Sequence, residues 1–150
     1  MNIDQKILED IVRKVISEQF ASQAQDFDKE IDRPSGIITV KTDTVTPERF
    51  DTGTAGDQVF LKDVVTLEES PRMMFGVMEM KAGSSFDWTL RYDEIDYIID
   101  GTLDIIVDGR CNRANKGDII FIPKNNSIAF STPDSVRFMY VTYPANWADQ

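Results

Sequence analysis

The chain has 150 residues, about the size of one ordinary domain, and it carries a formal net charge of −10 with a sequence pI near 4.4. That much negative charge repels phosphate backbones, so nucleic acid is excluded as an expected partner. No run of about twenty apolar residues is present to span a bilayer, and a single cysteine, Cys111, rules out an intramolecular disulfide and favours a reducing cytoplasm.

Residues 1–20 have the apolar spacing of an amphipathic helix. The apolar positions are Ile3, Ile7, Leu8, Ile11, Val12, Val15 and Ile16. Their recurrence places them along one face and predicts a short α-helix. Because a helix of this length is marginal alone in water, the stripe needs a surface to cover it. Its polar face mixes acidic and basic residues and is not basic enough for a membrane anchor.

The rest of the chain is predicted to be a linker and a β-rich body. Residues 21–35 are polar and lack apolar periodicity, which predicts the linker. From residue 36 the period changes to two, so the predicted body spans residues 36–150. Strand-like runs lie at Gly36–Val40, Gln58–Leu67, Met73–Met80, Tyr97–Val107, Asp118–Ile122, Ser127–Phe130 and Val136–Tyr143. Asp108-Gly109 favours a hairpin turn, and many short strands without intervening helices predict a sandwich or barrel.

Two stretches of the body keep the turn residues and spacing of a known fold. Gly83, Glu94 and Gly101 lie in the first stretch, and Gly117 and Pro123 lie in the second. In these positions the chain resembles the cupin superfamily. The resemblance implies a jelly-roll barrel, the double-stranded β-helix, which is open at one end. The expected fold class is therefore all-β, a cupin-type barrel preceded by a short N-terminal amphipathic α-helix.

The chain contains no histidine. Metal-binding cupins hold their ion with histidines, and this chain has residues 88–91 and Ile128 where those ligands would stand. Iron, copper, nickel and zinc sites are built largely from imidazole and thiolate, so we expect no transition metal. Magnesium prefers carboxylate and water and is compatible with this composition.

Glu94 and Asp96 are the first candidate site residues. Side chains alternate along a strand, so the two acids share one face, and the cupin resemblance implies that this face lines the barrel interior. Two carboxylates in one cavity predict a magnesium site, a general base, or a partner for Arg91. The alternative places Asp96 at a wet rim and pairs Glu94 with Arg91. Glu94, Asp96 and Arg91 are thus candidate catalytic residues, and the two acids are candidate metal ligands.

Six further residues are candidate groups for binding a small-molecule substrate: Lys62, Glu79, Trp88, Tyr92, Tyr97 and Tyr140. Glu79 interrupts an apolar strand, and its alternative is the solvated face of an edge strand. Lys62 could neutralise an anionic substrate, although a surface lysine is the commoner case. The aromatic side chains could line a cavity, or pack in the core or at a dimer interface.

Longer stretches of the body resemble one family in particular. These stretches are Phe60–Val65, Asp87–Tyr97, Phe130–Pro133 and Tyr140–Trp147. Over residues 36–148 the chain is similar to the EutQ family of ethanolamine-utilisation proteins. The resemblance implies a cytoplasmic location at bacterial microcompartments, a homodimer and, for some members, acetate kinase activity. That activity interconverts acetyl phosphate plus ADP with acetate plus ATP and would use magnesium. The alternative is a non-catalytic barrel that binds a small molecule or serves microcompartment assembly.

Two surfaces are predicted to bind partners. Ile95, Tyr97 and Ile99 lie on the opposite face of the strand from Glu94, and this apolar stripe predicts a homodimer through the outer sheet. Residues 1–20 resemble the short helices that direct cargo into microcompartments, which predicts docking on shell or cargo proteins. In the competing interpretation, this helix packs on the outer surface of its own dimer.

Overall fold

The computed structural model describes residues 5–23 and 26–150, and the chain divides into two compact units, Met1–Thr46 and Pro47–Gln150. The first unit contains helix α1 (Gln5–Gln23), strands β1 (Lys29–Asp32) and β2 (Ile37–Val40), and a 3-10 turn at Thr42–Thr44. The two strands form an antiparallel hairpin closed by a hydrogen bond from the Gly36 amide to the Asp32 carbonyl oxygen.

The boundaries of this unit differ from those predicted. The N-terminal helix is confirmed, but it ends at Gln23 instead of residue 20, and its predicted first four residues lie outside the described ones. The segment 21–35, predicted to be a linker, contains the end of α1 and all of β1. Strand β1 has the sequence Lys-Glu-Ile-Asp and pairs with β2 through its backbone, so it gives no apolar pattern to detect. The barrel unit correspondingly begins at Pro47, not at residue 36.

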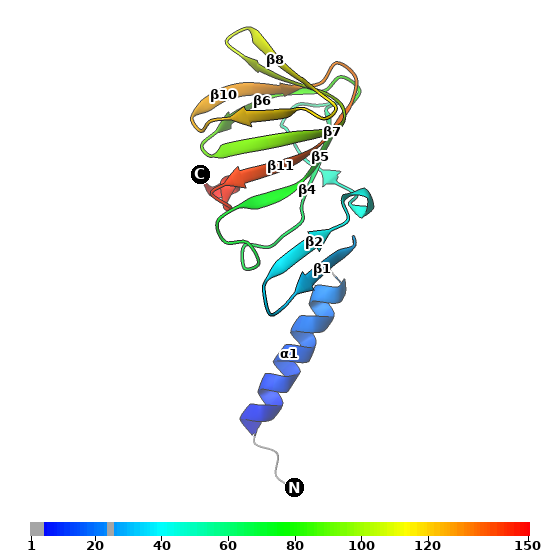
Figure 1. Ribbon diagram of the computed structural model, residues 1–150, viewed down its shortest axis with the longest axis vertical. Helices are drawn as coiled ribbons and strands as arrows, with labels where there is room; N and C mark the ends of the chain where they lie inside the picture. The colour runs from blue at the N-terminus through cyan, green and yellow to red at the C-terminus, as the bar shows by residue number, and fades with distance from the viewer. Residues whose placement is uncertain (1–4, 24–25) are drawn as a thin grey trace. The chain divides into compact units, whose positions relative to one another are not determined.

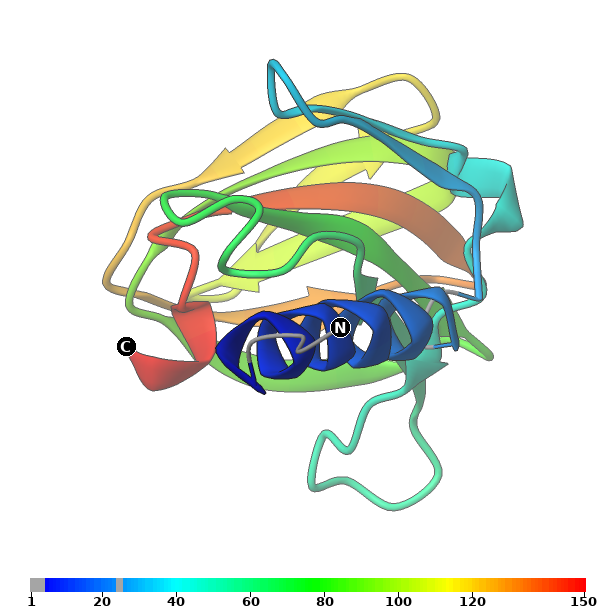
Figure 2. The ribbon, with the colours of Figure 1, turned by 90° about the horizontal axis from the view of Figure 1, so that it is seen from below.

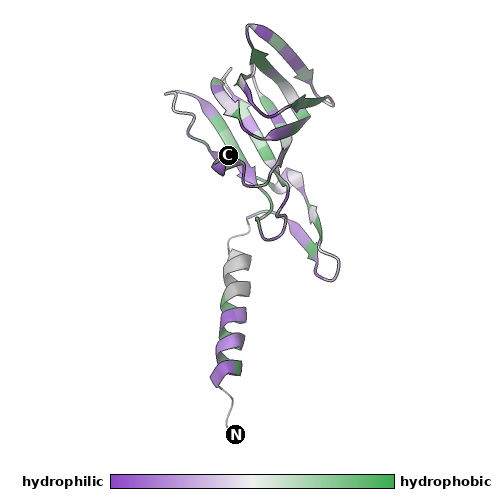
Figure 3. Cartoon of the chain, turned by 90° about the vertical axis from the view of Figure 1, so that its left-hand side faces the viewer, coloured by the Kyte–Doolittle hydropathy of each residue, from purple (hydrophilic) through white to green (hydrophobic). Residues whose placement is uncertain are grey.

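Within residues 5–16, helix α1 leaves its apolar side chains exposed, and apolar and polar positions alternate along this part of the helix (Figure 3). The side chains of this stripe are between 46% and 55% exposed: Ile7, Leu8, Ile11, Val12, Val15 and Ile16. Across residues 5–23 and 26–150, no helix combines the length and apolarity needed to cross a membrane. Docking of α1 on another surface stays a prediction.

The second unit is built from nine strands and a C-terminal 3-10 turn. They are β3 (Glu48–Arg49), β4 (Gln58–Asp63), β5 (Met74–Lys81), β6 (Ser85–Leu90), β7 (Asp93–Val107), β8 (Arg110–Asn115), β9 (Ile119–Ile122), β10 (Asn126–Ser131), β11 (Val136–Tyr143) and the turn Trp147–Asp149. Two curled antiparallel sheets result, ordered β3-β4-β5-β11-β7-β9 and β8-β7-β10-β6, and the long strand β7 belongs to both (Figures 1 and 2). The predicted all-β jelly-roll barrel with one N-terminal helix is confirmed.

Strand β7 passes from one sheet to the other at a bulge. Its residue Ile99 has no counterpart on β11, where the pairing register shifts. One unpaired residue reverses which side chains face inward, because the side-chain period of a strand is two. The core-facing side chains are accordingly Glu94, Asp96 and Ile98 before the bulge, and Leu103 and Ile105 after it.

The core lies between the two sheets. Phe86 of β6 stacks on Phe130 of β10 with ring centroids 5.4 Å apart, and Phe130 stacks on Phe138 of β11 at 6.5 Å. These contacts tie the smaller sheet to the larger one through buried aromatic area. Phe86 and Phe130 also form one wall of the cavity that contains the candidate site.

An apolar patch lies on the outer face of β7 and β9. It consists of two facing pairs, Ile95 with Phe121 and Tyr97 with Ile119. The four side chains are between 43% and 69% exposed, whereas Ile99, predicted in the same stripe, is partly buried at the bulge. Contiguous exposed apolar side chains of this kind mark interfaces, so we expect a homodimer joined through this patch.

Replacing Ile119 with lysine is expected to halve the molecular mass measured by light scattering at micromolar concentration. A lysine charge cannot enter an apolar interface without losing its hydration, which disfavours the dimer. Leu67, also apolar and exposed but located in the loop after β4, supplies the control, and Leu67→Lys should leave the dimer intact. An unmodified chain that is already monomeric would contradict the prediction.

Candidate functional site

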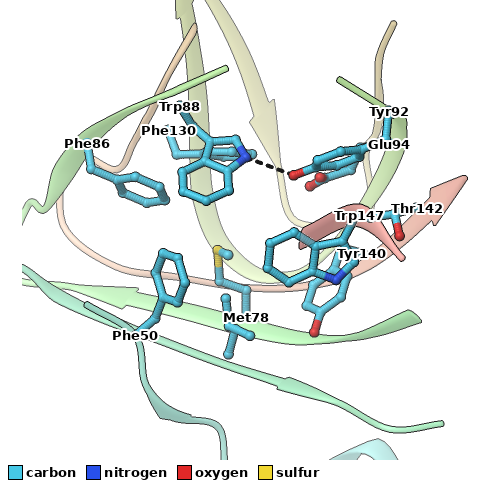
Figure 4. Close-up of a pocket in the computed structure, with 11 residues that line it drawn as sticks. Phe50, Met78, Phe86, Trp88, Tyr92, Glu94, Phe130, Tyr140, Thr142 and Trp147 are labelled. Atoms are coloured by element: carbon cyan, nitrogen blue, oxygen red, sulfur yellow. Dashed lines mark hydrogen bonds between the residues drawn. The ribbon is translucent and has the colours of Figure 1, made fainter. Parts of the chain in front are cut away.

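A cavity lies between the sheets, and most of its wall is aromatic (Figure 4). This inner cavity is lined by Phe50, Leu61, Met78, Phe86, Trp88, Tyr92, Glu94, Phe130, Tyr140, Thr142 and Trp147. Its volume is about 30 Å³, enough for roughly two water molecules. A wider hollow of about 420 Å³ shares Phe50, Trp88, Tyr92 and Trp147 with it. This outer hollow is further bounded by Asp87, Thr89, Arg91, Ala148 and Gln150.

Trp88 is at the centre of the aromatic wall. Alternation along β6 turns Phe86 and Trp88 to the inside of the barrel. The Trp88 ring packs edge-on against Phe50 at 5.7 Å and Trp147 at 6.2 Å between centroids. Its Nε1 donates a hydrogen bond of 2.8 Å to the Tyr92 hydroxyl, as Figure 4 shows. The rings are therefore fixed by packing and by one hydrogen bond at steep mutual angles.

Glu94 and Asp96 project inward from β7, as predicted. Glu94 is 4% exposed and Asp96 is fully buried. On β11 they lie opposite Thr142 and Tyr140. Within the described residues, neither carboxylate oxygen of Asp96 nor the Thr142 hydroxyl has a hydrogen-bond partner. The two carboxyl groups can hydrogen-bond to each other only when one of them holds a proton, because two carboxylates are both acceptors.

Burial changes the protonation of this pair. The pKa of Glu94 rises to about 7 because burial disfavours its charged form. The pKa of Asp96 rises well above its usual value, through burial first and then through the charge of Glu94. Near neutral pH the pair therefore retains a proton unless a cation takes its place.

Tyr140 reaches across a neighbouring strand to Asp63. Its hydroxyl donates a hydrogen bond of 2.7 Å to Oδ1 of Asp63, and its side chain passes over Gly76, its partner on β5. A Cβ at Gly76 would overlap both the Lys62 carbonyl oxygen and the Tyr140 hydroxyl, so only glycine fits. Burial raises the pKa of Asp63, while hydrogen bonds from Tyr140 and Trp147 oppose that rise. Asp63 thus positions two side chains of the cavity wall.

The structure brings together part of the predicted site. Trp88, Tyr92, Glu94 and Tyr140 line the inner cavity, and Asp96 lies behind Glu94. The alternative that placed Asp96 at a wet rim is wrong, because Asp96 is completely buried. No ion pair between Glu94 and Arg91 occurs in the described part of the chain. Arg91 is exposed and bounds the outer hollow instead.

Three predicted substrate-binding residues lie elsewhere. Lys62 forms an ion pair of 2.8 Å with Glu48, and Glu79 forms one with Arg137. Tyr97 belongs to the exposed patch on the outer face. Strand alternation explains all three positions, because the adjacent residues Leu61, Met78 and Asp96 are the ones that face inward.

Several wall residues were not singled out from the sequence. Thr142 follows Tyr140 by two positions on β11, so strand alternation could have identified it. Phe50 lies just outside β3 and Trp147 lies in the C-terminal 3-10 turn. Neither belongs to a periodic run, and only their tertiary packing brings them to the cavity.

Glu94 and Asp96 could supply only part of the ligand set of a metal ion. Within residues 5–23 and 26–150, no three or more histidine, cysteine or acidic side chains gather where they could hold a metal ion. A magnesium ion at Glu94 and Asp96 would take its other ligands from water or from substrate oxygens.

Comparison with known proteins identifies the family. The family model described as ethanolamine utilisation protein EutQ matches residues 3–149. A curated relative from Clostridioides difficile (strain 630), named "Acetate kinase EutQ", is 53% identical and aligns over 99% of this chain and 97% of its own length. Relatives of the same name from Salmonella typhimurium and Escherichia coli are 43% and 40% identical over 75% and 79% of this chain, which spans only 48% and 50% of their length.

Solved structures agree with this assignment. The EutQ protein of Clostridium difficile superposes with a TM-score of 0.81 at 57% identity, covering 85% of this chain and 93% of that one. A cupin superfamily protein from Desulfitobacterium hafniense superposes with a TM-score of 0.55 at 14% identity, covering 69% of this chain and 87% of that one. This second likeness shows the fold alone. The chain therefore belongs to the EutQ family of ethanolamine utilisation proteins, and its barrel has the cupin fold.

Proposed function

We propose that the chain is an acetate kinase, interconverting acetyl phosphate plus ADP with acetate plus ATP. Support comes from its 53% identity to a relative of nearly equal length that is named "Acetate kinase EutQ". In the direction of ATP formation, the bond between phosphorus and the acetyl oxygen breaks and a bond between phosphorus and a β-phosphate oxygen of ADP forms. The acetyl oxygen leaves as part of acetate, so atoms and charge balance.

Glu94 and Asp96 are the residues proposed to hold magnesium. Their oxygens are hard ligands of the type this ion prefers, and those of Asp96 have no donor in the described structure. An ion bound there would neutralise charge on the transferred phosphoryl group. The inner cavity is too small for a nucleotide, so both substrates would occupy the outer hollow.

Arg91 and Tyr92 are the side chains proposed to act on the substrates. Arg91 is exposed at the outer hollow, where its guanidinium can hydrogen-bond to phosphoryl oxygens. Burial and then the charge of Glu94 raise the pKa of Tyr92, so this phenol keeps its proton. A protonated Tyr92 can donate a hydrogen bond to the acetyl oxygen and orient it for departure.

Acetate kinase turnover of the purified chain, prepared from a host lacking its own acetate kinase, tests this proposal. The double variant Glu94→Gln/Asp96→Asn is expected to lose at least about 100-fold in kcat, since it removes both metal ligands. The matched control is Glu68→Gln, which neutralises an exposed acid away from the cavity and should keep full turnover. If the double variant turned over as fast as the unmodified chain, Glu94 and Asp96 would have no role in catalysis.

A second candidate function is non-catalytic binding of a small molecule. The inner cavity favours it, because the cavity wall is aromatic and no lysine or arginine of the described chain lines it. Complete absence of turnover in the unmodified chain with magnesium, acetate and ATP would leave this function as the better one.

A further inference from the structure

The inner cavity gathers acidic side chains without a balancing cationic side chain. Among the described residues, Glu94 is the one charged side chain that lines it, and Asp96 lies buried beside Glu94. Asp63 adds a third carboxyl group behind the Tyr140 hydroxyl. Since no lysine or arginine of residues 5–23 and 26–150 lines this cavity, no cationic side chain is present there to attract an anion. A bound cation would displace the proton that the Glu94 and Asp96 pair otherwise retains and allow both acids to ionise.

The same region contains acceptors that lack donors. Both oxygens of Asp96 and the hydroxyl oxygen of Thr142 are buried without partners among the described residues. Thr142 lines the cavity and lies opposite Glu94 across the β7–β11 pair. Buried polar atoms in proteins are nearly always hydrogen-bonded. A proton shared with Glu94 can satisfy Asp96, but the Thr142 hydroxyl still lacks a partner in the described part of the chain, and this gap indicates a missing ligand. A primary ammonium group carries three donors, which suits a cluster of carboxylate and hydroxyl acceptors.

The aromatic wall restricts which cation suits the site. Trp88, Tyr92 and Trp147 meet at steep angles beside Glu94, with ring centroids of Trp88 and Trp147 6.2 Å apart and those of Tyr92 and Trp147 5.9 Å apart (Figure 4). Aromatic rings attract organic cations through their electron-rich faces. A hydrated metal ion gains less from such walls, so in the absence of substrate oxygens a small organic cation suits a cavity of about 30 Å³ better than magnesium with its waters does.

We propose that the inner cavity binds a small organic ammonium ion. Its nitrogen lies against Glu94 and Thr142, its first carbons contact the Trp88 and Trp147 rings, and its tail extends into the outer hollow. A ligand of a few heavy atoms matches the inner volume. Binding does not depend on the kinase activity proposed above, but both would use the oxygens of Glu94, so the ammonium ion and magnesium compete.

Intrinsic fluorescence reports directly on this site, because the chain contains two tryptophans and both line the cavity. The intact chain is titrated without magnesium, at constant ionic strength, with ethanolammonium. The neutral control 1-propanol has the same heavy-atom skeleton with methyl in place of the ammonium group, and acetate is the anionic control. We expect a saturable change with ethanolammonium alone, and an apparent Kd that rises when magnesium is added.

Glu94→Gln is the decisive variant, because the amide keeps the shape of the side chain and removes its charge. It is expected to raise the Kd for ethanolammonium at least about tenfold. Glu68→Gln, with its exposed acid outside the cavity, should bind as the unmodified chain does. Thermal melting verifies that Glu94→Gln is folded, and loss of a buried charge should not lower its melting temperature.

Three results would overturn the inference: no saturable response to ethanolammonium, an equal response to 1-propanol, or unchanged affinity in folded Glu94→Gln. A response to acetate without magnesium would also oppose it, since the cavity would then accept an anion. Acetate kinase turnover is measured separately on the same preparation. Turnover without ammonium binding would sustain the proposed function and reject this inference, and binding without turnover would do the reverse.

Discussion

Replacing Gly76 with alanine is expected to destabilise the barrel by about 3 kcal/mol, which combines overpacking with loss of a hydrogen bond. The added Cβ would overlap the Lys62 carbonyl oxygen and the Tyr140 hydroxyl, so Tyr140 must leave its place beside Asp63. A loss of this size lowers the melting temperature by about 10 °C. Tryptophan fluorescence during thermal unfolding measures it, because both tryptophans lie in the barrel.

Two further variants separate the effect of overpacking at Gly76 from the effects of a glycine-to-alanine change in itself and of the lost hydrogen bond. Gly109→Ala changes a glycine with φ of +74° and no atom within 4 Å of the added carbon, so it should cost only about 1 kcal/mol of backbone strain. Tyr140→Phe removes the hydrogen bond to Asp63 without adding bulk and should also cost about 1 kcal/mol. If Gly76→Ala melts no lower than these two variants, then Tyr140 does not cross over Gly76 in solution.

Asp96→Asn is expected to stabilise the metal-free protein, and the gain should grow with pH. The raised pKa values of Asp96 and Glu94 mean that the native state holds a proton that the unfolded state releases. This contribution to stability is fully present below the unfolded-state pKa values and is lost as pH rises through the folded-state values. The free energy of unfolding of the unmodified chain therefore falls as pH rises from about 4 through about 7.

Asparagine cannot ionise, so the free energy of unfolding of the Asp96→Asn variant should fall much less as pH rises. At pH 8 its advantage should reach about 2 kcal/mol, since one pKa unit is worth about 1.4 kcal/mol and the buried amide still lacks partners. Near pH 4 the two proteins should melt alike. Asp100→Asn, on the same strand but exposed, is the matched control and should not shift the melting temperature. A variant that melts lower than the unmodified chain at pH 8, with chelator present, would show that Asp96 is stabilised in its charged form.

Apolar alternation was sufficient to locate most of the barrel. Strands β5, β10 and β11 lie within two residues of their predicted runs, and the hairpin at Asp108-Gly109 joins β7 to β8 with both residues at positive φ. Strand β8 escaped prediction because its sequence, Arg-Cys-Asn-Arg-Ala-Asn, has one buried residue and is held by backbone pairing with β7. Short polar strands of this kind carry no periodic signal.

The sequence predicted those features of the candidate site that depend on side-chain alternation within a single strand. Alternation along β7 correctly placed Glu94 and Asp96 together and Tyr97 on the other face, although Tyr97 was also considered a substrate-binding residue. Strand alternation alone cannot show that Trp147 covers the cavity or that Tyr140 reaches Asp63. Those contacts depend on how β4, β5 and β11 lie side by side. The protonation of the acid pair likewise follows from burial, which only tertiary structure determines.

Because of the bulge at Ile99, the alternation of inward-facing and outward-facing side chains along strand β7 has one phase before that residue and the opposite phase after it. Deleting that one residue would restore a single alternation through the strand, carrying Asp104 into the barrel and turning Leu103 and Ile105 toward solvent. Asp104 now lies on the opposite face of the strand from Leu103 and Ile105, where Arg113 donates two hydrogen bonds to it. The number of residues between Asp96 and Leu103, and not their identity, thus decides which side chains meet the core. In any relative whose interval differs by one residue, the alignment gap belongs at the bulge and in neither half of the strand.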